Sequence, residues 1–123
     1  MKISSPRYPT YVIYEGYDRA LALESVGSGW SSLINEVFNY IEQNRVHSKV
    51  IQVKEKFGGL RVYTDVVHEG LDEVIRNAGR KSFKICEDCG AVGVLRSGGW
   101  IRTLCDTHAN GKPPINEGID TEE

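Results

Sequence analysis

The clearest hydrophobic pattern of the chain lies between Trp30 and Asn44. Apolar side chains recur there at spacings of three and four residues, as on one face of an α-helix: Trp30, Leu33, Ile34, Val37, Phe38 and Ile41. The stripe is one-sided, so we expect this helix to lie on another element. A shorter stripe predicts a second helix from Leu71 to Arg80, and the aromatic and β-branched run Tyr11–Glu15 predicts a strand.

A β-hairpin is predicted between the two helices, from Val50 to Val66, with its turn at Gly58-Gly59. Two glycines accept the positive φ angles that a two-residue hairpin turn needs. With this turn, Phe57 lies opposite Leu60 on a side that is apolar apart from Glu55. We take that side as the core face.

The other face of the hairpin is unusually basic. The predicted turn pairs Lys56 with Arg61 across the strands, and the next pair on the same face is Lys54 with Tyr63. Like charges opposite each other weaken a sheet, so an anionic partner is one reason to keep them there. A base or nucleotide can stack on Tyr63 or on Trp100 while the cations hold phosphate. The alternative is that lysine and arginine are simply the usual residues of an exposed strand.

Three cysteines and one histidine form two pairs with equal spacing, Cys86-x2-Cys89 and Cys105-x2-His108. The segment between the pairs is centred on Ser97-Gly98-Gly99 and predicts a second hairpin, which brings the pairs together. Three thiolates and one imidazole make a closed tetrahedral site, the usual arrangement around a structural zinc ion. The sequence therefore predicts one structural zinc ion bound by these four residues.

Other chemistries of the cysteines are weighed against zinc. Buried thiols or a redox pair would account for Cys86 and Cys89, but neither accounts for a second pair that ends in histidine. A catalytic zinc ion keeps one position open for water, whereas four candidate ligands are present here. Iron–sulfur ligation usually takes a fourth cysteine, and the chain has three.

The composition is that of a globular chain of 123 residues, with 40% hydrophobic and 26% charged residues. The patterns together predict an α+β fold, in which a small antiparallel sheet and two helices form a body at residues 1–84. A zinc-ribbon-like β-hairpin module at residues 85–110 is expected to pack on this body. Residues 111–123 contain four carboxylates and one lysine, and we expect a disordered acidic tail there.

The charge of the chain limits the classes of partner. The net charge is −2, and the residues before the tail carry +1, so nucleic-acid binding would need a local basic patch. No apolar run approaches the ~20 residues that span a bilayer. The first residues also lack the apolar stretch of a secretory signal. We expect a cytoplasmic protein that does not bind membranes.

Three sequence blocks carry a resemblance: Gly29-Trp30 before the first helix, Val53-Lys54-Glu55-Lys56-Phe57-Gly58-Gly59-Leu60-Arg61-Val62-Tyr63 in the hairpin, and the cysteine segment. Over residues 27–109 this combination resembles a widespread uncharacterised family of small phage and bacterial proteins. The resemblance implies a phage or prophage origin and no particular activity.

The cysteine segment alone resembles zinc-ribbon and treble-clef modules. In a treble clef the second ligand pair begins a helix, but Asn110-Gly111-Lys112-Pro113 would end any helix here quickly, which favours a ribbon-like module.

The function expected from these features is that of a non-enzymatic, zinc-stabilised binding protein. Its partner would be a host protein or an anionic ligand, as in host takeover or anti-defence, and the candidate contact residues are Lys54, Lys56, Arg61, Tyr63 and Trp100. A nucleic-acid-binding zinc ribbon is the first alternative. A small enzyme acting on a nucleotide is the second, although the chain has no phosphate loop, dinucleotide fingerprint or serine motif.

Overall fold

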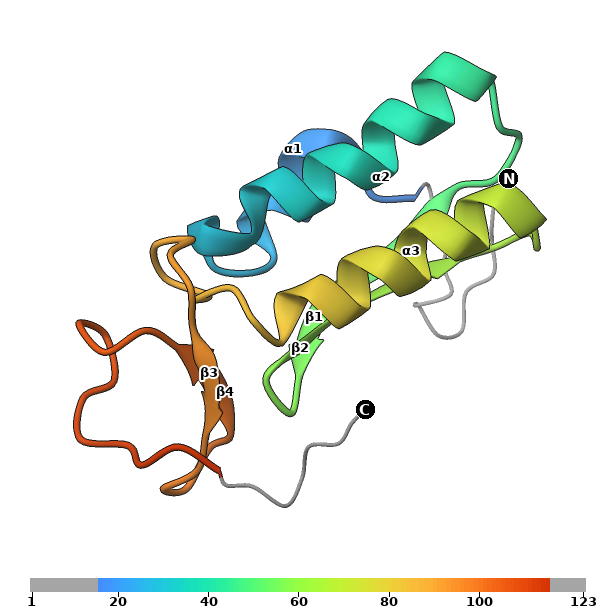
Figure 1. Cartoon of the computed structure of the whole chain (residues 1–123). Coiled ribbons are helices and arrows are strands. Elements are labelled where there is room, and N and C mark those ends of the chain that lie inside the picture. Colours follow the sequence, from blue (N-terminus) through green and yellow to red (C-terminus); the bar gives the residue numbers. More distant parts are fainter. Residues whose placement is uncertain (1–15, 116–123) are drawn as a thin grey trace, which may run out of the picture.

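The computed structural model describes residues 16–115 and has the expected α+β fold (Figure 1). Its helices are α1 (Arg19–Glu24), α2 (Ser31–Asn44) and α3 (Glu69–Ser82), with a 3-10 turn, η2 (Ser28–Trp30), before α2. Its strands are β1 (Val50–Lys56), β2 (Gly59–Thr64), β3 (Val94–Arg96) and β4 (Arg102–Leu104). The strand predicted at Tyr11–Glu15 lies outside the described residues.

Both predicted helices are present, and for each of them one neighbouring residue explains where it begins or ends. α2 ends where Arg45 adopts a left-handed φ of 51°. α3 begins at Glu69 because Nδ1 of His68 accepts a hydrogen bond from the backbone N–H of Leu71, at 3.1 Å. The short helix α1 was not predicted; Asp18 caps it by accepting from the N–H of Leu21. None of the helices in residues 16–115 has the length and apolarity to cross a bilayer.

The main core lies between the helices and one face of the β1–β2 hairpin. α2 and α3 lie side by side over this face (Figure 1). The apolar stripe of α2 is buried as its spacing predicts, with Ile41 at its edge. The buried members of the core are Ala22, Trp30, Leu33, Ile34, Val37, Phe38, Val50, Val53, Leu60, Val62, Leu71 and Ala78.

The β1–β2 hairpin has a different register from the predicted one. Its turn residues are Phe57 and Gly58, with φ angles of 54° and 81°, and Gly59 is already the first residue of β2. Gly59 is needed in the strand because a Cβ there would lie 2.4 Å from the ring of Phe83. The turn therefore lies one residue earlier in the chain than predicted. Phe57 does not face Leu60 in the core, and its side chain is 62% exposed.

The new register changes the cross-strand pairs but keeps the faces. Lys54 lies opposite Arg61, and Tyr63 lies opposite Gln52, so the predicted pairs Lys56 with Arg61 and Lys54 with Tyr63 are wrong. Moving the turn by one residue shifts the partners of residues 52–56 by two positions, and side chains alternate with a period of two. The basic residues therefore still share the face away from the helices.

A buried serine joins α3 to β2. Ser82 is fully buried; its hydroxyl donates to the carbonyl of Gly79 and accepts from the N–H of Leu60. Ser82→Ala would leave this N–H without a partner, so we expect the free energy of unfolding to fall by about 1–3 kcal/mol. Denaturant unfolding measures this. Ser25→Ala is the control, because within residues 16–115 its hydroxyl bonds only the nearby carbonyl of Leu21; an equal loss in both variants would contradict the prediction.

The second hairpin, β3–β4, sits beside the turn of the first one (Figure 1). Val94 pairs with Leu104 and Arg96 with Arg102, so the hairpin predicted between the ligand pairs is present.

Residues 111–115 continue along β3 and do not behave as the start of the expected tail. Ser97 donates to the carbonyl of Pro113 and Ile115 to that of Leu95, at 3.0 and 2.9 Å. The guanidinium of Arg96, which is buried, also donates to the carbonyl of Lys112. The rest of the expected tail, residues 116–123, lies outside the described residues.

Candidate metal centre and the neighbouring hairpin face

The structure brings Cys86, Cys89, Cys105 and His108 together, with their ligand atoms all within 4.8 Å of one another. The sulfur atoms of Cys89 and Cys105 are 3.6 Å apart. Nδ1 of His108 lies 3.3 Å from the sulfur of Cys105 and 3.8 Å from that of Cys86. Sulfur ligands ~2.3 Å from a central ion lie ~3.8 Å apart in a tetrahedron. The four side chains therefore have the spacing of a tetrahedral metal site.

The first ligand pair sits on a tight backbone turn, which we call the knuckle (residues 86–90). The N–H of Gly90 donates to the carbonyl of Cys86 at 2.9 Å, and Gly90 has a φ of 86°, which glycine adopts without strain. The N–H of Ala91 points at the sulfur of Cys89, at 3.5 Å. The knuckle thus directs both sulfurs to the same side.

The surroundings favour negative charge on two of the three sulfurs. Burial raises the pKa of Cys105, but hydrogen bonds from His108 and from the other two cysteines outweigh it and lower the pKa to about 6. The pKa of Cys86 is also lowered, because backbone hydrogen bonds outweigh its burial. The same sulfurs raise the pKa of His108. Such a cluster attracts a cation, and a metal ion would compete with the proton for these atoms.

A buried ion pair supports the knuckle from behind, and sequence reasoning missed it. Glu87 is only 3% exposed; its carboxylate accepts from the guanidinium of Arg102 and from the N–H of Thr103 at 2.9 Å. Arg102 also donates to Asp88 at 3.0 Å. This pair fixes the two residues between Cys86 and Cys89 against β4. No sequence signal distinguishes Glu87, which lies in a turn, from a solvated carboxylate, because its partner Arg102 lies fifteen residues away on β4.

The knuckle contacts the body at the start of α2. The N–H of Gly29 donates to the carbonyl of Glu87, and the indole N–H of Trp30 donates to the carbonyl of Ile85, both at 2.8 Å. We call this the helix–knuckle contact. A second link joins the two hairpins, where the hydroxyl of Thr103 donates to the carbonyl of Gly58 at 2.7 Å and is buried.

Four of the five predicted ligand-binding residues share the face of the β1–β2 hairpin that points away from the helices. Lys56 and Tyr63 are exposed there, and Lys54 and Arg61 are half-buried. The ammonium group of Lys54 lies 6.0 Å from the centre of the Tyr63 ring. Among residues 16–115, none of the three cations forms an ion pair. We call Lys54, Lys56, Arg61 and Tyr63 the cationic face.

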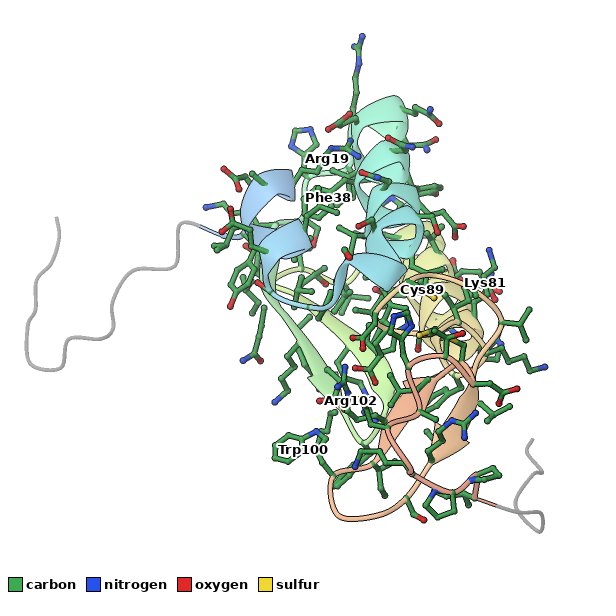
Figure 2. The ribbon with its side chains drawn as sticks, turned by 90° about the vertical axis from the view of Figure 1, so that its left-hand side faces the viewer. Arg19, Phe38, Lys81, Cys89, Trp100 and Arg102 are labelled. Atoms are coloured by element: carbon green, nitrogen blue, oxygen red, sulfur yellow. The ribbon has the colours of Figure 1, made fainter. Side chains whose placement is uncertain are left out.

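The fifth predicted residue, Trp100, lies on the loop of the β3–β4 hairpin and not on the cationic face itself. Its side chain projects at the outer edge of the molecule (Figure 2) and is 70% exposed. Together with Phe57 it borders a cleft of about 360 Å³ between the tips of the two hairpins. Sequence reasoning missed Phe57 as a surface residue, because the predicted turn placed it in the core.

No known protein family, curated protein or solved structure matches the chain. The segment after Cys105 forms turns, and residues 106–115 contain no helix. This differs from a treble clef, in which a helix follows the second ligand pair. The described module is therefore a β-hairpin with a knuckle.

Proposed function

We propose that the protein is a cytoplasmic, zinc-stabilised binding protein whose cationic face binds an anionic ligand. Cys86, Cys89, Cys105 and His108 would hold one structural zinc ion. The zinc ion would stabilise the cysteine module, and the cationic face would bind the ligand.

The donor set supports zinc among the metals. Three thiolates and one imidazole suit this ion, and the 3.3 to 3.8 Å separations fit a tetrahedron. Four protein ligands leave no open position for a substrate, which favours a structural role over a catalytic one. A reducing compartment such as the cytoplasm keeps the thiols available as ligands.

The observation that carries the binding function is the absence of ion pairs, within residues 16–115, at Lys54, Lys56 and Arg61. Lys54 lies directly opposite Arg61 across the strands. Like charges in this position cost stability relative to neutral residues. An anion on the face would offset that repulsion, and charge-assisted hydrogen bonds to these donors are about twice as strong as neutral ones.

A heparin column tests the cationic face. We expect the double variant Lys54→Glu/Arg61→Glu to elute at clearly lower salt than the wild-type protein, because two anion-binding donors are replaced by repelling charges. The control is Arg76→Glu/Lys81→Glu, which changes the net charge equally on the exposed surface of α3. Equal elution of the two double variants, or no retention of the wild-type protein, would overturn the proposal.

A further inference from the structure

We propose that the cleft between Phe57 and Trp100 receives an unpaired nucleobase, so that the ligand of the cationic face is a single-stranded nucleic acid. This inference rests on the proposed function, since it assumes that the cations bind an anion. It adds the chemical class of that anion and the part of it that enters the cleft.

The two rings are presented on fixed supports. The loop of Trp100 is held by the ammonium group of Lys112, which donates to the carbonyls of Gly98 and Trp100, each at 2.9 Å. The indole N–H of Trp100 donates to the carboxylate of Glu55 at 3.3 Å. Phe57 sits in a tight turn with a positive φ angle. Two large aromatic side chains are thus kept exposed, at 62% and 70%, on either side of one cleft.

The distribution of charge separates a place for a base from a place for phosphate. Glu55 and Lys56 both line the cleft, and the carboxylate of Glu55 lies against the indole of Trp100, so a phosphate group would be repelled from the Trp100 side and drawn to the Lys56 side. The ammonium group of Lys56 lies 5.7 Å from the centre of the Phe57 ring, and Lys54 and Arg61 follow along the same face. An uncharged aromatic base therefore suits the cleft that the two rings border, with the strand's phosphates over the cations.

A third exposed ring favours a nucleic acid over an isolated phosphate or a phosphorylated protein. Tyr63 is 40% exposed next to Lys54, at the end of the cationic face away from the cleft. Phe57 lies near Lys56 at one end of the cationic face and Tyr63 near Lys54 at the other, and this alternation of rings and cations matches that of bases and phosphates in a strand. In a duplex the bases are stacked on each other and cannot enter a cleft, so the strand must be single.

Fluorescence anisotropy with three labelled probes tests the inference: a single strand of about 12 nucleotides, an abasic strand of the same length, and the duplex. We expect the single strand to bind about tenfold or more tightly than the abasic strand or the duplex. Trp100→Ala should lower its affinity to the abasic level without changing abasic binding, and Trp100→Phe should retain part of the gain. Val92→Ala, an exposed apolar side chain of the same module, is the control.

The probes separate failure of this inference from failure of the proposed function. Equal binding of the normal and abasic strands, both weakened by Lys54→Glu/Arg61→Glu, would overturn base stacking and leave the anionic ligand in place. Binding of neither strand would overturn this inference and leave the cleft to an apolar side chain of a protein partner; the proposed function would fail with it only if heparin also did not retain the wild-type protein. Unchanged binding by Trp100→Ala with an unchanged melting temperature would also overturn the assignment to the cleft.

Discussion

Removal of the proposed zinc ion with a chelator is expected to unfold the cysteine module while the helices of the body persist. Within residues 16–115, the separate apolar cluster of the module consists of Cys86, Leu104 and Cys105, and two of these are proposed ligands. Structural zinc contributes ~10–16 kcal/mol in isolated zinc-finger peptides, which matches the whole stability of an ordinary domain. The α2–α3 core contains none of the ligands, so far-UV circular dichroism should retain its helical signal.

The fluorescence of Trp30 reports directly on unfolding of the cysteine module. Its indole N–H bonds the carbonyl of Ile85 next to the first ligand, so its fluorescence should change on chelation and recover when zinc is added back. A Trp100→Phe background leaves Trp30 as the sole tryptophan. His108→Ala should change the fluorescence of Trp30 in the same way as chelation does. His47→Ala, which replaces an exposed histidine, should leave the fluorescence unchanged. Elemental analysis should find one zinc ion per chain; protein prepared without chelator that contains no zinc would contradict the assignment.

The sequence was sufficient for features that depend on local pattern. The apolar stripe of α2, the two hairpins and the four clustered ligands all follow from spacings of two to four residues, with a glycine turn closing the second hairpin. These signals are strong because hydrophobic periodicity and ligand spacing depend only on residues that are close together in the sequence or that one hairpin brings together.

Features that depend on distant packing could not be predicted. The turn of the first hairpin moved because Gly59 lies under the ring of Phe83, a contact across more than twenty residues. Two consecutive glycines offered two turn positions, and contacts with distant residues such as Phe83 and Thr103 favour the observed one. The burial of Glu87 and Arg96 likewise depends on partners from other segments. The cations still share one face, as predicted, because the predicted pairing was wrong by two positions and the side chains of a strand alternate with a period of two.

The three sequence blocks that carry the family resemblance are in contact in the structure, and these contacts give each block a physical role. Gly29-Trp30 lies against the knuckle through the helix–knuckle contact. The turn of the β1–β2 hairpin lies against β4, through the bond between Thr103 and Gly58. The candidate metal site therefore lies on the module that two separate segments of the body contact, and a change at either contact should reach the ligands.

Gly29→Ala is expected to be among the most damaging substitutions outside the ligands. A Cβ at this position would lie 2.0 Å from the carbonyl oxygen of Cys86 and 2.6 Å from that of Glu87. Both are backbone atoms, so no side chain can rotate away, and α2 must separate from the knuckle. Overpacking of ~1–3 kcal/mol and the loss of two hydrogen bonds lower the free energy of unfolding by about 2–5 kcal/mol. Thermal melting should show a decrease of about 10 °C or more.

Gly79→Ala is the matched control for this effect. Gly79 lies inside α3, where alanine is favoured over glycine by ~1 kcal/mol, and its Cβ would lie 3.4 Å from the carbonyl of Leu60, an ordinary contact. We expect its melting temperature to stay the same or rise. Because Cys86 supplies both a ligand and the clashing carbonyl, Gly29→Ala should also weaken zinc retention in a chelator competition, although all four ligands remain. Wild-type stability together with wild-type zinc retention in Gly29→Ala would mean that the knuckle does not depend on its contact with α2.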